Sequence, residues 1–199
     1  MADSYQPTQR TTLRRLPARA AYDRETVHAI LDEALVAHVA VMTDVGPRII
    51  PTTYARVEET VYVHGSAANH LLRVAATEVE LCLAVTLLDG LVLARSAFHH
   101  SMNYRSAVVY GRARAVTDAG EKRRALDAIV DHVAPGRSRE ARPPTDAELR
   151  STLVLALPLD EVSAKVRTGG PLDDEADLSR PVWAGVIPMR LVAGDPVPA

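Results

Sequence analysis

Short segments with the alternating pattern of β-strands recur through most of this chain, and helical patterns interrupt them at irregular intervals. A doubly wound sheet would show a regular alternation of strand and helix, which is missing here. We therefore predict a mainly β fold with decorating helices, built as a small barrel of roughly six strands. The strand-like runs are residues 38–43, 48–57, 60–65, 79–88, 106–116, 152–159 and 161–167.

Local signals predict where the helices begin. Asp23 has the position of an N-cap before an apolar stripe over residues 27–35. Residues 118–121 have the spacing of a capping box, and residues 145–148 form a second one. A short helix over residues 68–76 is predicted to interrupt the strands.

The length of 199 residues fits a single folded domain. Residues 1–21 are polar and lack an apolar period, so we interpret them as an N-terminal arm. We expect the domain itself to span residues 22–190, followed by a C-terminal tail at 191–199.

Charge and cysteine content exclude several kinds of partner and site. The net charge is −2, so we expect neither nucleic acid nor an anionic membrane as partner. No stretch approaches the roughly 20 apolar residues of a membrane span. A single cysteine, Cys82, excludes an intrachain disulfide framework and a multi-cysteine zinc site, which predicts a cytoplasmic protein without a metal centre.

Motifs of the common nucleotide sites and hydrolases are absent. The sequence contains no GK[ST] loop and no GxG pair, the marks of phosphate and dinucleotide loops. GxSxG and HExxH are missing as well. Catalysis by a nucleophile elbow or by a zincin is therefore not supported.

The densest polar cluster is the segment 96–106, which we predict to be a loop. Its serines, asparagine and arginine are donors that suit a phosphate monoester, although a polar connection that satisfies its own backbone is equally consistent. The adjacent residues His99 and His100 would point to opposite faces of a strand, so we do not expect them to chelate one ion.

Two further segments have groups that suit a ligand. At 61–73 a strand ends in Gly65-Ser66 and a helix begins, so Ser66 either caps that helix or donates to an anion near Arg73. At 49–54, Pro51 interrupts a strand pattern, which predicts an edge or a bulge whose free backbone can face a planar ligand.

Taken together, these segments resemble the flavin-nucleotide-binding branch of the pyridoxamine 5'-phosphate oxidase-like proteins. The resemblance implies an FMN-binding split β-barrel and a homodimer with each flavin in a cleft between two subunits. The segments that carry it are IPTTYAR, VYVHGSAANHLLR, LLDGLVLARSAFHHSMNYRSAVVYG, SAKVRTGGP and RPVWAGVIP.

The resemblance also implies a set of cofactor-binding residues. One group would lie along the isoalloxazine ring, a second would follow a strand to the phosphate end, and a third would close the phosphate site. Trp183 would reach the flavin from its own or the other subunit. The groups are Ile50, Pro51 and Thr52; His64, Gly65, Ser66, His70 and Arg73; and Asn103, Tyr104, Arg105 and Ser106.

The resemblance does not extend to the substrate-binding residues. Pyridoxine phosphate oxidases hold their substrate with an Arg-x-His motif near the C-terminus, and here no histidine follows His132. We therefore expect an FMN-dependent oxidoreductase acting on a small redox substrate other than pyridoxamine phosphate, with no catalytic side chain assigned. The alternatives are a flavin carrier or sensor without turnover, and a barrel that holds haem with a histidine as iron ligand.

Overall fold

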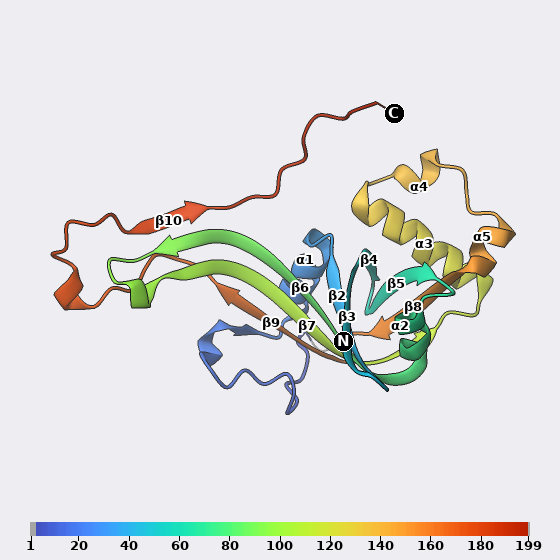
Figure 1. Ribbon diagram of the computed structural model, residues 1–199, viewed down its shortest axis with the longest axis horizontal. Helices are drawn as coiled ribbons and strands as arrows, with labels where there is room; N and C mark the ends of the chain where they lie inside the picture. The colour runs from blue at the N-terminus through green and yellow to red at the C-terminus, as the bar shows by residue number, and fades with distance from the viewer. Residues whose placement is uncertain (1–2, 199) are drawn as a thin grey trace.

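The strands of this chain form one curled antiparallel sheet, seen in the computed structural model, which describes residues 3–198 (Figure 1). The predicted mainly β barrel with decorating helices is confirmed. The strands are β1 (Ala20–Ala21), β2 (Ala37–Thr43), β3 (Gly46–Thr52), β4 (Tyr54–Val57), β5 (Thr60–Ser66), β6 (Thr77–Leu93), β7 (Ser101–Ala115), β8 (Thr152–Pro158), β9 (Glu161–Arg167) and β10 (Gly185–Pro188).

The order of the strands makes the sheet a split barrel. The main path runs β3-β2-β6-β7-β8-β5-β4, so β3 and β4 are its two ends. Yet Thr53 alone separates these two strands in the chain. The sheet must therefore curl until its ends meet at Thr53, where one continuous strand had been predicted over residues 48–57.

Helices lie at the ends and edges of the sheet, and their first turns match the predicted signals. Asp23 accepts a hydrogen bond from the Thr26 backbone N–H (2.8 Å), and Asp118 caps its helix in the same way. The second half of the box predicted at residues 118–121 does not form, because the Glu121 carboxylate accepts from Arg114 and Tyr62 instead. Thr145 and Glu148 form a complete capping box. The helices are α1 (Arg24–Glu33), α2 (His70–Ala75), α3 (Ala119–Val133), α4 (Arg137–Glu140) and α5 (Asp146–Ser151), with short 3-10 turns at Pro17–Arg19, Ala97–His99 and Glu175–Asp177.

Aliphatic side chains fill the barrel, as the low content of aromatic residues requires. Helix α1 contributes Val27, Ile30 and Leu31 to the same core cluster as the inward residues of the strands. The aromatic ring of Tyr54 is fully buried there, and its hydroxyl donates to the Leu31 carbonyl (2.6 Å). That bond satisfies the one polar atom that the ring brings into the core.

Strands β6 and β7 form a long curved hairpin that extends beyond the barrel (Figure 1). Strand β6 continues through Asp89-Gly90, with an irregularity between Leu88 and Gly90. Strand β7 begins at Ser101, so the predicted loop over 96–106 is wrong for its second half. The polar residues 101–106 pair with β6, and β9 pairs with Tyr104 onward, so neighbouring strands supply the partners that their backbone needs.

The N-terminal residues pack along the barrel. Strand β1 pairs with β9, and Tyr5 is buried with its hydroxyl bonded to Glu59 (2.9 Å). At the other end, the chain beyond β10 runs extended and exposed (Figure 1). None of the helices over residues 3–198 has the length and hydropathy that crossing a bilayer would need.

Candidate functional site

A hollow between β3 and α2 brings together two residues of the predicted cofactor site. Ile50 on β3 and His70 at the start of α2 both line it, and its volume is about 240 Å³. Asn69 closes one side and caps α2, because its side chain accepts hydrogen bonds from the backbone N–H groups of Leu71 (3.0 Å) and Leu72 (3.2 Å). The cap predicted at Ser66 is thus at Asn69. We call this space the β3 hollow.

The register of the sheet connects the β3 hollow to β7. Pro51 pairs with His38 on β2, His38 pairs with Ala84 on β6, and Ala84 pairs with Val108 on β7. Ser106 lies two residues from Val108 on the same strand. The sheet therefore places the Pro51 and Ser106 segments at nearby heights with two strands, β2 and β6, between them, although they are distant in sequence. The strand order places β3, and with it Pro51, at an edge of the sheet, as the proline predicts.

The guanidinium group of Arg105 is already engaged by two carboxylates. Its Nε and Nη2 donate to Asp89 (2.9 and 2.8 Å), and its Nη2 also donates to Glu33 (2.8 Å). The Arg105 hydrogen bond lowers the pKa of Glu33, and the two acids raise the pKa of Arg105. A phosphate at this position would compete with Glu33 and Asp89 for the same donors.

Asn103 and Arg167 form a buried polar cluster that the sequence prediction covered only in part. Arg167 donates to the Asn103 side-chain oxygen and to the carbonyl groups of Gly169 (3.2 Å) and Gly170 (3.0 Å). Asn103 in turn donates to the Gly169 carbonyl (3.1 Å). All three acceptors are uncharged, and burial lowers the pKa of Arg167. Arg167 was missed as an individual residue, although it lies within the SAKVRTGGP segment.

The other residues of the predicted phosphate group show different surroundings. Tyr104 is half-buried and pairs with Arg167 of β9, and the Ser106 hydroxyl donates weakly to the Lys165 carbonyl (3.4 Å). Arg73 is exposed in the last turn of α2, and Thr52 donates to the Thr53 carbonyl (3.2 Å).

Gly65 is required by packing inside the barrel. A Cβ atom at this position would lie 2.6 Å from Cδ1 of Leu72, which is fully buried on α2. Its neighbour Ser66 is exposed, and its hydroxyl accepts from the Ala68 backbone N–H (3.2 Å). The glycine therefore allows α2 to lie against the end of β5, and this position of α2 forms one wall of the β3 hollow.

His64 lies on the opposite face of β5, away from the β3 hollow. Side chains alternate along a strand, and Val61 and Val63 point into the barrel core, so Tyr62 and His64 face outward toward α3. His64 lines a second cavity of about 560 Å³, the α3 cavity, whose apolar wall comes from α3. The wall consists of Leu126, Ile129, Val130, Val133 and Ala134.

The ring of His64 has a polar atom without a partner. Nδ1 of His64 is buried and makes no hydrogen bond with any of residues 3–198. Burial lowers the pKa of His64 from its ordinary value of 6.5, so the imidazole is neutral at neutral pH. Polar side chains also line the α3 cavity, among them Arg137, Ser138 and Arg142 and the acidic Asp127 and Glu148. The sequence pointed to the apolar stripe of α3 but did not show that it faces a cavity.

Trp183 and the adjacent histidines lie away from the β3 hollow. Trp183 precedes β10 and lies against Gly185, which pairs with Leu93, whereas β2 pairs with β6 no further than Ala84. Nine residues of strand separate these points, or about 30 Å. His99 pairs with Asp174 (3.1 Å) and His100 with the Ser96 carbonyl (3.0 Å), so both have structural partners.

Comparison with known proteins gives several matches. A family model described as pyridoxamine 5'-phosphate oxidase matches residues 23–166. The flavocytochrome Anf3 from Azotobacter vinelandii is 43% identical with a TM-score of 0.91, and the alignment covers 98% of this chain and 91% of that one. The FAD and heme binding protein from Mycobacterium smegmatis is 38% identical with a TM-score of 0.87, covering 91% and 89%.

A more distant structure shares the fold. It is a putative 5-nitroimidazole antibiotic resistance protein from Bacteroides thetaiotaomicron, 24% identical with a TM-score of 0.62 over 74% of this chain and 86% of that one. No curated protein matches the chain.

Proposed function

Since the chain belongs to the pyridoxamine 5'-phosphate oxidase family, we propose that it is a flavin-dependent oxidoreductase. The observation that carries the proposal is that Ile50 and His70, from two different elements, line one hollow at the open edge of the sheet. Strand β3 pairs only with β2, so its outer backbone groups are free to meet the polar edge of an isoalloxazine ring. Pro51 has no backbone N–H, so this edge offers fewer hydrogen-bond donors to a bound ring.

The size of the β3 hollow supports a homodimer. Its volume of about 240 Å³ is below the roughly 300–1,000 Å³ of ligand pockets. Three large apolar side chains are mostly exposed on the adjoining β2–β3 hairpin, namely Met42, Val45 and Ile49. A second copy of the chain that covers this hairpin would bury them and complete the cleft.

We take FAD as the flavin in preference to FMN. The sequence resemblance implied FMN, while the M. smegmatis relative is described as binding FAD. FMN and FAD share the isoalloxazine, the ribityl chain and the first phosphate, so the residues assigned to FMN serve either flavin.

Haem is part of the proposal as a second cofactor. One relative is described as a flavocytochrome and the other as an FAD and heme binding protein, and both exceed 35% identity over nine-tenths of this chain. The sequence alone predicts haem as an alternative to flavin. The β3 hollow and the α3 cavity are separate, with no lining residue in common, so the two groups need not compete.

Bound flavin would supply hydride or single-electron transfer, and the protein would supply binding and orientation. Ile50 and the β3 backbone would fix the plane of the ring, and the partner copy would exclude water from it. No described side chain is assigned as acid or base. The substrate is a small redox-active molecule, and the single cysteine fits a cytoplasmic setting.

The visible spectrum of the purified protein tests the proposal. We expect an oxidised-flavin spectrum, release of FAD on denaturation, and a dimer by light scattering. Ile50→Glu should lower flavin occupancy, whereas Val57→Glu, a change on β4 outside the lining of the hollow, should not. A colourless protein that takes up neither FMN nor FAD would refute the proposal. Anaerobic reduction by NADH or NADPH, followed by added acceptors, separates an enzyme from a carrier or sensor, which would turn over slowly.

A further inference from the structure

The lining residues of the α3 cavity come from β5, the second half of α3 and the stretch from α4 to the start of β8. Figure 1 shows α3, α4 and α5 on the same side of the molecule as β5. Its volume of about 560 Å³ is within the range of pockets that hold a whole cofactor. It shares no lining residue with the β3 hollow. The flavin assigned to that hollow therefore leaves the α3 cavity unexplained.

The apolar wall of the cavity is incompletely covered by protein. Ile129 is buried, but Val130 and Val133, on the same side of α3, are 40% and 50% exposed. The first half of α3 packs normally, with Ala125 against Val154 and Ala156 of β8. The helix thus passes from a packed half to an open apolar half, and an apolar ligand would cover the open half.

His64 is the histidine in the lining of this cavity. Buried polar atoms in proteins are nearly always hydrogen-bonded, so the unpartnered Nδ1 of His64 calls for an explanation. A purely structural histidine would use both ring nitrogens, as far as geometry allows, on neighbouring carbonyl or hydroxyl groups. His64 lines the α3 cavity, so a ligand in the cavity can reach this ring, and a ligand that binds an imidazole nitrogen accounts for a histidine beside the apolar wall of α3.

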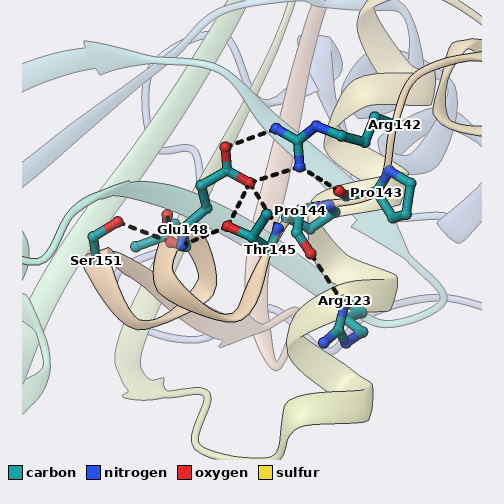
Figure 2. A network of polar contacts seen from close by, with 8 residues as sticks. Arg123, Arg142, Pro143, Pro144, Thr145, Glu148 and Ser151 are labelled. Atoms are coloured by element: carbon teal, nitrogen blue, oxygen red, sulfur yellow. Dashed lines mark hydrogen bonds and ion pairs between the residues drawn. The ribbon is translucent and has the colours of Figure 1, made fainter.

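Two arginines stand at the polar side of the cavity. Arg137 pairs with Glu140 (2.8 Å), and Arg142 forms hydrogen bonds with Glu148 (2.8 and 3.1 Å), as Figure 2 shows for Arg142. Both pairs are well exposed, and such pairs contribute little stability. Arg137 can therefore turn to a ligand carboxylate at small cost, and Glu148 keeps its hydrogen bonds from Thr145 when Arg142 turns away.

We propose that the α3 cavity is the haem site of this protein, with His64 as the iron ligand and Arg137 and Arg142 as partners of the propionates. The assignment rests on the proposed function, in which the chain carries haem beside flavin. Haem would match all three features at once: it is broad and apolar, its iron accepts an imidazole nitrogen as a ligand, and it has two carboxylates at one edge. A flavin would bring a phosphate for the arginines but no metal ion that takes the His64 nitrogen as a ligand.

Haem titration of three proteins, followed by absorbance, tests the assignment. These are the wild-type chain, His64→Ala, and the control His99→Ala, whose histidine pairs with Asp174 outside the cavity. We expect a Soret band in the wild type and the control. In His64→Ala haem affinity should fall by more than the roughly 10–100-fold that loss of an outer-shell partner costs. Added imidazole should restore part of the band, and the iron–histidine vibration of the ferrous wild type should be absent from the variant.

A second variant keeps the test independent of folding. Val130→Trp should block the cavity and lower haem uptake while His64 remains, and flavin content should stay at the wild-type level in every variant that folds. If His64→Ala binds haem with wild-type affinity and spectrum, this assignment is overturned although the chain carries haem. If the wild type binds flavin but no haem, both the assignment and the haem part of the proposed function fail, while the flavin part stands.

Discussion

Arg105 in β7 and Glu33 at the end of α1 are joined through the fork of the guanidinium, with Asp89 on its other side. These two ion pairs connect α1 to the β6–β7 hairpin. They also use the guanidinium group of Arg105, the residue that the sequence assigned to the flavin phosphate. Measurements of stability and of flavin affinity separate a structural role of Arg105 from a role in binding the flavin.

Replacing Arg105 and Ser106 together by alanine should weaken flavin binding by about 2 kcal/mol, because a phosphate would lose charge-assisted partners. The variant should also lose about 1 kcal/mol of stability, because Glu33 and Asp89 lose their shared cation. Fluorescence titration with flavin and urea unfolding measure the two effects. Arg112→Ala on the same strand is the control, since Arg112 pairs with the exposed Glu80 and not with Glu33 or Asp89. Loss of stability with unchanged flavin affinity would make Arg105 a purely structural residue.

Gly65→Ala should destabilise the fold by roughly 1–3 kcal/mol, because the new Cβ would overlap the side chain of the buried Leu72. Urea unfolding of this variant should be compared with that of Gly170→Ala, where a Cβ would meet nothing within 4 Å. The flavin affinity of the folded Gly65→Ala protein shows whether Gly65 also contacts the cofactor. A stability equal to that of the wild type would contradict the packing role.

Arg167→Met should cost roughly 1–3 kcal/mol, because Asn103 and the carbonyl groups of Gly169 and Gly170 would lose a donor in a buried place. The same substitution at Lys165, two residues earlier on β9, provides the comparison. Thermal unfolding of both proteins, with hydrogen exchange of the backbone amides of residues 168–170, measures the effect. If the Arg167 variant unfolds at the wild-type temperature with unchanged exchange, the cluster does not anchor this segment.

The capping box of α5 should make a contribution to stability that is lost in acid. The Arg142 side chain and the Thr145 backbone N–H lower the pKa of Glu148 from 4.5 to about 2. A carboxylate whose folded pKa is below its unfolded value stabilises the fold fully above pH 4.5, and the contribution disappears as the pH falls toward 2. The difference in urea stability between wild type and Glu148→Gln should therefore be larger at pH 7 than at pH 3. A Glu148→Gln difference that grows in acid would reverse the sign argued here.

Several parts of the fold were predictable because their causes are local. The caps at Asp23 and Asp118 and the box from Thr145 to Glu148 join groups three residues apart, so the sequence alone contains both partners. The alternating runs likewise identified most strands, because the two faces of a strand differ in burial wherever it crosses the barrel. The family resemblance added the curled topology.

Other parts depended on residues that meet only in the folded chain. The strand character of 101–106 depends on pairing with β6 and β9, and no pattern within those six polar residues indicates it. The surroundings of Arg105 depend on Glu33 and Asp89, which come from two other elements. The individual roles in flavin binding of the residues around Arg105 and His70 stay predictions.

The same distinction separates the two cavities. From the sequence came a mainly β chain of one domain, the positions of its caps, and segments typical of a flavin site. The α3 cavity came from the arrangement in space, because His64 and Val130 belong to a strand and a helix far apart in the chain. Local propensity and capping act over a few residues, whereas cavities, ion pairs and shared ligands arise where distant segments are packed side by side.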